Sequence, residues 1–414
     1  MLKSILRSIF RGDPPSTQKG RSELVFYNLW LHIHPAKVRK EHLKLRHTGY
    51  LGFVSFFLLL ILGATGLALM FYYHPYPPRA YQDMKDLQFV VFLGPFLRNM
   101  HRWAAQLLVV AVFLHLCRVF CAGAYKEPRQ FNWVVGVLLL FLVLTLSFTG
   151  YLLPWDQKAF WAITVGTNIV ASAPLVGPVV KVLLLGGHSL GTQALLRFYV
   201  LHVAVLPGLA AALVMVHLWR IRKDGGLAPS PSGPQEPSSP PRETPIPASP
   251  EKSYGLMGIV TGKPTFEVLV PEEEETVFSY PYAFLREGAA FLATSAAVMA
   301  LALLYNAPLS EVADPSKTPN PAKAPWYFLG VQELVSHSPA LSGILLPSLL
   351  VLALLLLPYY DRNPSRRPKD RVLALSLFAL VVLSYFVLLL IGLYFRGAGW
   401  AWIWPWAKGA GGAA

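Results

Sequence analysis

Charged side chains are scarce in this chain: they make up 14% of its 414 residues, against 54% hydrophobic residues. An ordinary soluble domain carries about 25% charged residues, so this composition excludes one and favours an integral membrane protein. Cysteine is almost absent as well. Cys117 and Cys121 are the two cysteines of the sequence, and no C-x-x-C-H motif for covalent haem attachment accompanies them. We interpret both as small packing residues rather than as a disulfide or a zinc site.

Long apolar runs, by contrast, are abundant. About 20 apolar residues in a helix cross the hydrocarbon core of a bilayer. The runs predict seven such helices, at 48–73, 98–122, 133–153, 196–220, 284–305, 341–360 and 372–395. The first 47 residues are basic and only intermittently apolar. We therefore expect a cytoplasmic surface segment there and no cleavable signal.

The net charge of +14 is explained by membrane topology rather than by a nucleic-acid partner. Basic residues gather before the first predicted helix and in three later segments, at Lys126 and Arg129, at Arg220, Arg222 and Lys223, and at Arg362, Arg366, Arg367, Lys369 and Arg371. With a cytoplasmic N-terminus, all of these clusters fall on the cytoplasmic side of the bilayer, where positive charge is favoured. We expect a multi-pass protein of a bacterial inner (cytoplasmic) membrane that binds no nucleic acid.

One segment divides the chain. Residues 225–252 are rich in proline and serine and lack apolar periodicity, which predicts a linker. It separates a four-helix domain (1–224) from a three-helix domain (253–414). Residues 154–195 are amphipathic and interrupted by proline, so we expect short helices on the outer surface there. The expected fold is all-α: a four-helix membrane bundle plus three further transmembrane helices.

Four histidines on two predicted helices carry the strongest functional signal. His101 and His115 are 14 residues apart on the second helix, and His202 and His217 are 15 apart on the fourth. At 1.5 Å and 100° per residue, the members of each pair lie about 21–22 Å apart on one face of their helix. Two imidazoles on opposite sides of a flat macrocycle form a bis-histidine haem site. Two facing helices of this kind predict two stacked haems, one near each membrane surface.

Glycines repeat the same period. Gly52 and Gly66 lie on the first helix, and Gly136 and Gly150 on the third. Glycine lets a flat ligand approach the backbone, although small residues also serve plain helix packing, and a single histidine is often just a packed residue. Polar groups inside membranes are costly, so four histidines at matched depths favour haem. From the helix directions, we expect Gly66 and Gly150 at the outer level with His101 and His202, and Gly52 and Gly136 at the inner level with His115 and His217.

Three arginines flank the histidines of the second helix: Arg98, Arg102 and Arg118. Guanidinium groups bind carboxylates bidentately, so these residues are candidate partners of the haem propionates. Arg98 and Arg118 are explained equally well as ordinary interfacial anchors.

Longer motifs resemble the cytochrome b family of the quinol-oxidising bc and bf complexes. HRWAAQLLVVAVFLH (101–115) is similar to the second helix of that family, and GYLLPWDQKAFWAITVGTNI (150–169) to its outer surface segment. RFYVLHVAVLP (197–207) and HLWRIRKDG (217–225) are similar to its fourth helix. The 15-residue histidine spacing and the PWDQ and IRKDG runs resemble the bf type. That type splits its polypeptide where this chain has its linker, whereas here the halves are fused.

The resemblance implies a dihaem cytochrome b subunit of a quinol:cytochrome c (or equivalent acceptor) oxidoreductase in an electron-transport chain. Quinol would be oxidised at the outer face. One electron would pass to a Rieske iron–sulfur protein, and the other through two non-covalent b haems to a quinone at the inner face, contributing to the proton-motive force. Expected partners are the Rieske protein, a c-type cytochrome subunit or equivalent acceptor, and a second copy in a homodimer.

The chain departs from that family in two places. The bf type attaches an extra haem through a cysteine at the start of its first helix. Aligning FYYHP (71–75) puts Tyr50 at that position, so no covalent c-type haem is expected. In the outer loop the family has Pro-Glu-Trp-Tyr, where this chain has APWY (324–327). Pro325 thus replaces the glutamate that helps to remove a quinol proton, and proline accepts none.

The resemblance also implies two quinone sites. The outer pocket should be lined by Phe160, Trp161, Ile163, Trp326 and Phe328. Such walls suit a ring-shaped apolar substrate, although an aromatic belt at the membrane interface is the alternative. We expect Tyr327 to act directly on quinol, and Glu333 or else His337 to replace the missing proton acceptor. At the inner face Arg222 and Asp224 are candidates, and plain surface charge explains them equally well.

Two other classes of protein compete with this interpretation. A dihaem membrane anchor of a dehydrogenase or hydrogenase would use the same histidines, but it would lack the outer quinol loop and the PWDQ run. A transporter or channel would show broken helices and inverted repeats around a midplane site, and the sequence does not show them.

Overall fold

The computed structural model describes residues 16–21, 37–224, 226–227 and 276–406. Within them, seven helical spans are long and apolar enough to cross a membrane. They are α4 (Leu51–Met70), α6 (Gly94–Cys121), α7 (Gln130–Leu152), the run Thr192–Lys223, α13 (Ser279–Leu304), the run Leu341–Tyr360 and α16 (Val372–Tyr394). The predicted all-α membrane fold with seven spans is confirmed. The predicted linker 225–252 lies almost wholly outside the described residues, so the two-domain division stays a prediction.

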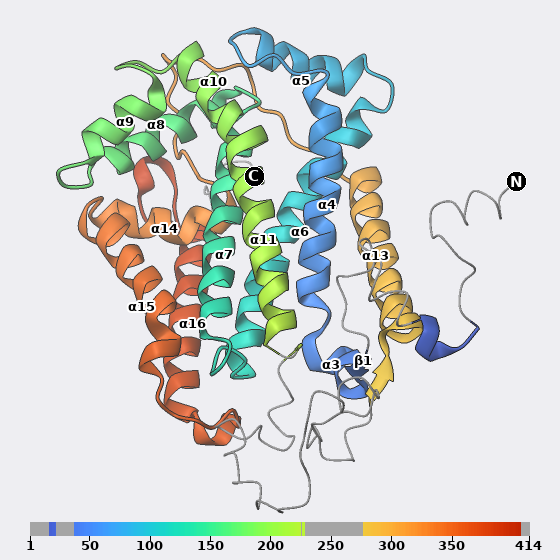
Figure 1. Cartoon of the computed structure of the whole chain (residues 1–414). Coiled ribbons are helices and arrows are strands. Elements are labelled where there is room, and N and C mark those ends of the chain that lie inside the picture. Colours follow the sequence, from blue (N-terminus) through green and yellow to red (C-terminus); the bar gives the residue numbers. More distant parts are fainter. Residues whose placement is uncertain (1–15, 22–36, 225, 228–275, 407–414) are drawn as a thin grey trace, which may run out of the picture.

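Four helices form a central bundle: α4, α6, α7 and α11 (Leu206–Lys223) (Figure 1). The helix α13 lies on one side of this bundle, and α15 (Leu346–Tyr360) and α16 lie on the other. Apolar side chains such as Leu58, Ala104 and Leu108 fill the interior, while Leu67 and Leu114 face outward. Helices that are apolar on all sides suit this arrangement, because lipid replaces water around them.

The fourth span contains a π-helical turn. The helix α10 (Thr192–Val200) runs into the π-turn η3 (Leu201–Val205) and then into α11, with Pro207 in its first turn. Proline lacks the N–H of a helical residue, and its ring would clash with the carbonyl four positions earlier, here that of Val203; a wider turn relieves both problems. Since a π-turn absorbs one extra residue, the 15-residue histidine spacing on this span behaves like the 14-residue spacing on α6.

Short helices gather at one end of the bundle, which we call the outer end after its predicted orientation (Figure 1). They are α5 (Arg79–Phe89), α8 (Gln157–Ala171), α9 (Gly177–Leu185) and α14 (Trp326–His337). The short helices predicted within 154–195 are therefore present. Asp156 sets the start of α8, because its Oδ1 accepts the N–H of Ala159 at 2.8 Å as a helix N-cap.

The PWDQ run also holds the loop that precedes α14. Oδ2 of Asp156 accepts the N–H of Ser310 at 2.9 Å. Oε1 of Gln157 accepts the N–H of Asp314 at 2.6 Å, and its Nε2 donates to the carbonyl of Lys317 at 2.5 Å. Both side chains are buried. Sequence analysis used this run as a family motif, and the structure shows that two of its side chains fasten the second half of the chain to α8.

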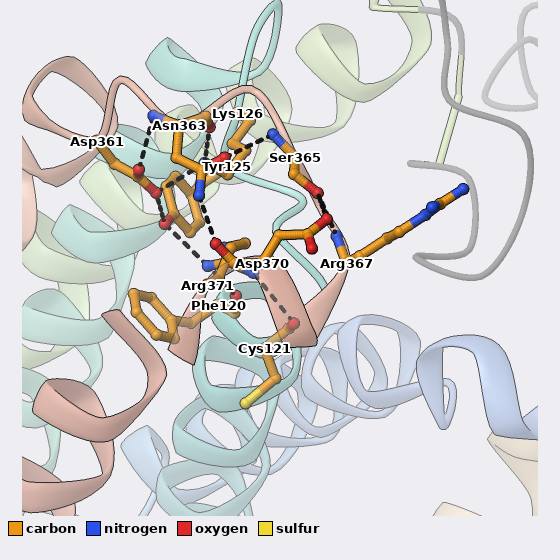
Figure 2. Close-up of polar contacts among 10 residues, drawn as sticks. All are labelled: Phe120, Cys121, Tyr125, Lys126, Asp361, Asn363, Ser365, Arg367, Asp370 and Arg371. Carbon is orange, nitrogen blue, oxygen red and sulfur yellow. Dashed lines mark hydrogen bonds and ion pairs between the residues drawn. The ribbon is translucent and has the colours of Figure 1, made fainter. Parts of the chain in front are cut away.

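The opposite, inner end is fastened by charged side chains (Figure 2). Here the α6–α7 and α15–α16 connections meet. Nζ of Lys126 lies 2.8 Å from Oδ2 of Asp361, and the hydroxyl of Tyr125 donates to the same carboxylate. Arg371 is 2% exposed and donates to the carbonyl of Phe120 at 3.0 Å and to the Tyr125 hydroxyl at 2.9 Å. We call Tyr125, Lys126, Asp361 and Arg371 the inner clasp.

A small antiparallel sheet lies at the same end and was not predicted. The strand β1 (Lys37–Arg39) pairs with β2 (Thr276–Phe278), which leads into α13. Arg286 of α13 donates to the carbonyl of Leu43, and so does the hydroxyl of Tyr50, at 3.0 Å. The segment before the first span is thus joined to the start of α13.

Candidate haem and quinone sites

The outer histidines face each other across the bundle. The ring centres of His101 on α6 and His202 on η3 are 6.3 Å apart, and the ring planes are inclined at 76°. A bond from an imidazole nitrogen to a transition metal is about 2 Å long, and the ring centre lies about 1 Å behind that nitrogen. Two imidazoles on opposite sides of one iron therefore have centres about 6 Å apart. The observed separation fits one haem iron between the two rings.

Two threonines fix these rings. Oγ1 of Thr65 is 2.9 Å from Nδ1 of His101, and Oγ1 of Thr149 is 3.1 Å from Nδ1 of His202. Each hydroxyl donates its own proton to a carbonyl one turn earlier, so its oxygen is left to accept from the ring. Nδ1 then carries the imidazole proton, and Nε2 presents a lone pair to a metal. Sequence analysis missed both residues, although a repeated Thr-Gly pair was the available signal.

Each predicted glycine lies against a histidine ring. A Cβ atom added to each would lie within a few ångströms of a ring Cε1: 3.2 Å for Gly52 and His115, 3.3 Å for Gly66 and His101, 3.5 Å for Gly136 and His217, and 2.6 Å for Gly150 and His202. This pairing by level agrees with the one predicted from helix direction. The glycines make room for the imidazoles themselves, and their contact with a macrocycle stays a prediction.

The chemistry of the donor set also fits haem. Among the described residues, no group of three or more His, Cys, Asp or Glu side chains could enclose a metal ion. Facing pairs of histidines suit a metal whose remaining ligands come from a macrocycle. The inner histidines, His115 and His217, occupy the corresponding second level on α6 and α11.

The predicted propionate partners differ in what they contact. The guanidinium of Arg98 donates to Gln88 at 3.0 Å and to the carbonyls of Ala307 and Pro308 at 2.7 Å each. Since Arg98 is buried and bonded to protein oxygens, we remove it from the proposed propionate partners. Arg102 is half-buried and lies 5.8 Å from the ring centre of Tyr151. Arg118 is half-buried near the inner level, and both remain candidates.

The aromatic run of α14 faces the central bundle. Nε1 of Trp326 donates to Oε1 of Gln106 on α6 at 2.7 Å. The ring of Tyr327 is 5% exposed and packs edge-on between those of Trp326 and Phe328, at 5.4 and 4.9 Å between centres. Burial raises the pKa of the Tyr327 hydroxyl, so it stays protonated at neutral pH and can donate a hydrogen bond to a substrate.

On the α8 side of the predicted pocket, Phe160 and Trp161 lie together, whereas Ile163 belongs to the core. Phe160 and Trp161 pack edge-on at 5.8 Å, and Nε1 of Trp161 donates to the carbonyl of Lys317 at 3.0 Å. Ile163 is fully buried in a hydrophobic core cluster, which suits packing better than lining a cavity.

Phe148 of α7 links α8 to α14, and sequence analysis missed it. Its ring lies 6.0 Å from that of Phe328 and presses against Gly166 of α8, where an added Cβ would be 2.7 Å away. The two predicted walls of the pocket therefore meet through this third aromatic residue.

The carboxylate of Glu333 is already bound by other side chains. Glu333 is 1% exposed, and Arg396 binds its carboxylate bidentately. The indole Nε1 of Trp400 also donates to the carboxylate, at 3.0 Å. Burial acts to raise its pKa, but the hydrogen bonds from Arg396 and Trp400 outweigh burial and lower the pKa below the ordinary carboxylic value. A carboxylate held in this way is a weak base, so the prediction for Glu333 needs revision. His337 is exposed, 3.6 Å from the same carboxylate.

Polar atoms without partners mark the inner candidate site. Oδ1 of Asp224 is 2.9 Å from Arg220, and its backbone carbonyl accepts from Arg129 at 3.1 Å. Oδ2 of Asp224, Nε of Arg220 and Oδ1 of Asn132 are buried and have no hydrogen-bond partner within the described part of the chain. Buried polar groups seek partners, so this place suits a polar ligand or ordered water. Arg222 is the penultimate residue of α11, and its predicted role in quinone binding stays a prediction.

Fold and site together define a multi-pass helical membrane protein whose facing histidines fit a b-type haem. Residues 106–313 match the family described as Cytochrome b(N-terminal)/b6/petB, and residues 312–407 match Cytochrome b(C-terminal)/b6/petD. The chain belongs to the cytochrome b/b6 family, so the resemblance inferred from its motifs is confirmed.

Individual relatives agree. Cytochrome b6 of Heliomicrobium gestii is 41% identical over 175 residues, which is 42% of this chain and 82% of the relative. The menaquinol:cytochrome c reductase cytochrome b subunit of Bacillus subtilis (strain 168) is 45% identical over 179 residues, 43% of this chain and 80% of the relative. A solved structure described as hyperthermophilic respiratory Complex III covers 86% of both chains with a TM-score of 0.68 and 25% identity.

Proposed function

We propose that this chain is the dihaem cytochrome b subunit of a quinol:cytochrome c (or equivalent acceptor) oxidoreductase. The observation that carries the proposal is the outer histidine pair, whose 6.3 Å separation fits one iron. The glycine contacts repeat this arrangement at a second level. His101 and His202 would hold the outer haem, and His115 and His217 the inner one. The relative from Bacillus subtilis, a menaquinol:cytochrome c reductase cytochrome b subunit, supports the same activity.

At the outer end, quinol would lie against Trp326, Tyr327 and Phe328, with Phe160 and Trp161 on the α8 side. The Tyr327 hydroxyl, kept protonated by burial, would orient the quinol by a hydrogen bond. One quinol electron would leave for a Rieske iron–sulfur protein and the other for the bundle, where bound haem passes single electrons. The pairing of the Glu333 carboxylate with Arg396 argues that a group other than Glu333 takes the quinol proton in place of the missing glutamate.

At the inner end, a quinone would be reduced beside Asp224 and Arg222, where unpartnered polar atoms of Asp224, Arg220 and Asn132 support a polar ligand. With the N-terminus in the cytoplasm of a bacterial cell, electron flow from the outer to the inner end separates charge across the membrane. A c-type cytochrome subunit or equivalent acceptor and a homodimeric complex complete the proposal, and the domains would be 1–224 and 253–414 with 225–252 as linker.

The first experiment is a reduced-minus-oxidised spectrum of the purified protein with pyridine haemochrome quantification. The parent should carry about two b haems per chain, and His101→Ala and His217→Ala should each remove one. His188→Ala is a matched control, because this histidine is exposed in the loop after α9. Loss of haem in neither variant would refute the ligand assignment.

A second experiment separates a quinol oxidase from a dihaem membrane anchor. Quinol should reduce the haems of the parent rapidly, and Tyr327→Phe should slow that reduction while leaving haem content unchanged. Two haems without a Tyr327-dependent reaction would favour the anchor.

A further inference from the structure

The buried carboxylate of Glu333, outside the central bundle, accepts hydrogen bonds from both Arg396 and Trp400. Nε of Arg396 lies 3.1 and 3.0 Å from its two oxygens, and a second guanidinium nitrogen also donates to it. Bidentate arginine–carboxylate pairs fix both distance and orientation. Glu333 and Tyr327 are six residues apart on α14, so their side chains point about 120° apart around the helix. Glu333 therefore holds α14 from a face other than the one that carries Tyr327.

The partners of Glu333 belong to a tight hairpin that follows α16. Residue Arg396 forms an antiparallel bridge with Trp402, and the N–H of Ile403 donates to the carbonyl of Phe395 at 3.0 Å. Within the hairpin, Arg396 also donates to the carbonyl of Trp400 at 3.2 Å and lies 5.4 Å from the ring centre of Trp402. Contacts within the hairpin thus hold the guanidinium of Arg396 in the position from which it binds Glu333. We call residues 395–403 the C-terminal hairpin.

The same helix is held at two further points. Gln332 donates to the carbonyl of Ala322 and accepts the N–H of Ala324, both at 2.7 Å, which sets the entry into α14. Against α16, the hydroxyl of Tyr385 donates to the carbonyl of Tyr327 at 2.5 Å, and its ring leaves no room for a Cβ at Gly330. These contacts share one effect: they fix the rotation of α14 about its axis and its position along that axis.

We propose that Glu333, Arg396 and Trp400 are positioning residues of the outer quinol site, which use the C-terminal hairpin to aim Tyr327 and Trp326 at the central bundle. The inference rests on the proposed quinol oxidation and assigns Glu333 a role other than proton transfer. A substitution of Glu333 or of Arg396 should therefore have one common result: the Tyr327 ring moves and quinol oxidation slows.

The test compares Glu333→Gln, Arg396→Gln and Arg396→Lys in the purified complex with a menaquinol analogue as reductant. Because a misplacement of about 1 Å can cost about a hundredfold in rate, both glutamine variants should lower kcat/KM by about tenfold or more while haem content stays at the parent value. Arg396→Lys keeps the positive charge but cannot bind the carboxylate bidentately, so its kcat/KM should lie between those of Arg396→Gln and the parent. Lys369→Gln, an exposed cation in the α15–α16 connection, is the control and should match the parent.

Hydrogen exchange of the amides of α14 supplies a readout that does not depend on activity. Both glutamine variants should speed exchange across Trp326–His337 and leave that of α8 unchanged. If Glu333→Gln abolished turnover and Arg396→Gln had no effect, Glu333 would act chemically and the proposal would be overturned. Unchanged exchange in α14 for both variants would overturn it as well. A parent protein that does not oxidise quinol but shows faster α14 exchange in the variants would refute the proposed function and leave the bracing contact in place.

Discussion

The two ends of this protein are held together by different chemistry. At the outer end, single side chains bind backbone groups of the segment between α13 and α14; two are neutral (Asn99 and Gln157) and two are charged (Arg98 and Asp156). Threonine hydroxyls bind the histidines there. At the inner end, the clasp joins two connections through a buried ion pair and a buried arginine. Neutral hydrogen bonds respond little to pH, whereas buried charges do. The comparison teaches that one bundle can support its two histidine levels by independent contacts at its two ends.

The two glycines of α7 differ most in their contact with histidine, and this gives the largest expected effect, the loss of a whole haem. Gly150→Ala would place Cβ 2.6 Å from the ring of His202, whereas Gly136→Ala would place it 3.5 Å from that of His217, an ordinary contact. Overpacking costs about 1–3 kcal/mol, and the side chain that it displaces here is His202, the proposed haem ligand. Haem quantification should show loss of the outer haem in Gly150→Ala and both haems in Gly136→Ala.

Gly208→Ala on α11 is the control, because nothing lies within 4 Å of the added atom. Two haems in Gly150→Ala, with parent-like spectra, would contradict the tight contact between Gly150 and His202.

The inner clasp gives an effect that depends on pH. Burial acts to raise the pKa of Asp361, but its bonds with Lys126 and Tyr125 outweigh burial and lower it. The stabilisation by this carboxylate is therefore complete above the ordinary carboxylic pKa, and it is lost as pH falls through the lowered folded value. Asp361→Asn should cost about 2–4 kcal/mol near neutral pH and should flatten the acid limb of a plot of melting temperature against pH.

Gln157→Ala tests the opposite end in the same assay. It removes a buried amide that bonds to the backbone of Asp314 and Lys317, and should cost about 1–3 kcal/mol without changing the pH dependence. A parallel loss of acid sensitivity in both variants would remove the distinction between the two ends.

The threonines give the smallest effect. An Nδ1–H that donates to a hydroxyl makes an imidazole a stronger donor to ferric iron, so its loss should raise the midpoint potential. A hydrogen bond of about 1 kcal/mol corresponds to about 40 mV for one electron. In a redox titration, Thr65→Val and Thr149→Val should raise the outer haem potential by a few tens of millivolts and leave the inner one unchanged. Thr145→Val, one turn earlier on α7 and bonded to the carbonyl of Phe141, should shift neither.

Much of this arrangement was readable from the sequence. Spans follow from apolar length, and the pairing of glycines with histidines follows from a shared period and alternating helix direction. Among the residues that sequence analysis missed, Phe148 acts through contacts between helices that no local pattern encodes. Thr65 and Thr149 also act between helices, and the repeated Thr-Gly pair was their one local signal. The pairing of Glu333 was hidden for the same reason: its partner Arg396 is 63 positions away, and the sequence does not show that a hairpin brings the two together.

The inner clasp also has a consequence for synthesis of the chain. Lys126 and its partner Asp361 are separated by 235 positions. A ribosome adding about 5–20 residues per second needs roughly 10–50 s to reach the second residue after the first. During that interval the α6–α7 connection of the nascent protein holds a cation whose carboxylate does not yet exist, so water must solvate it. The clasp therefore closes late, and its closure marks the moment at which the last two spans have joined the central bundle.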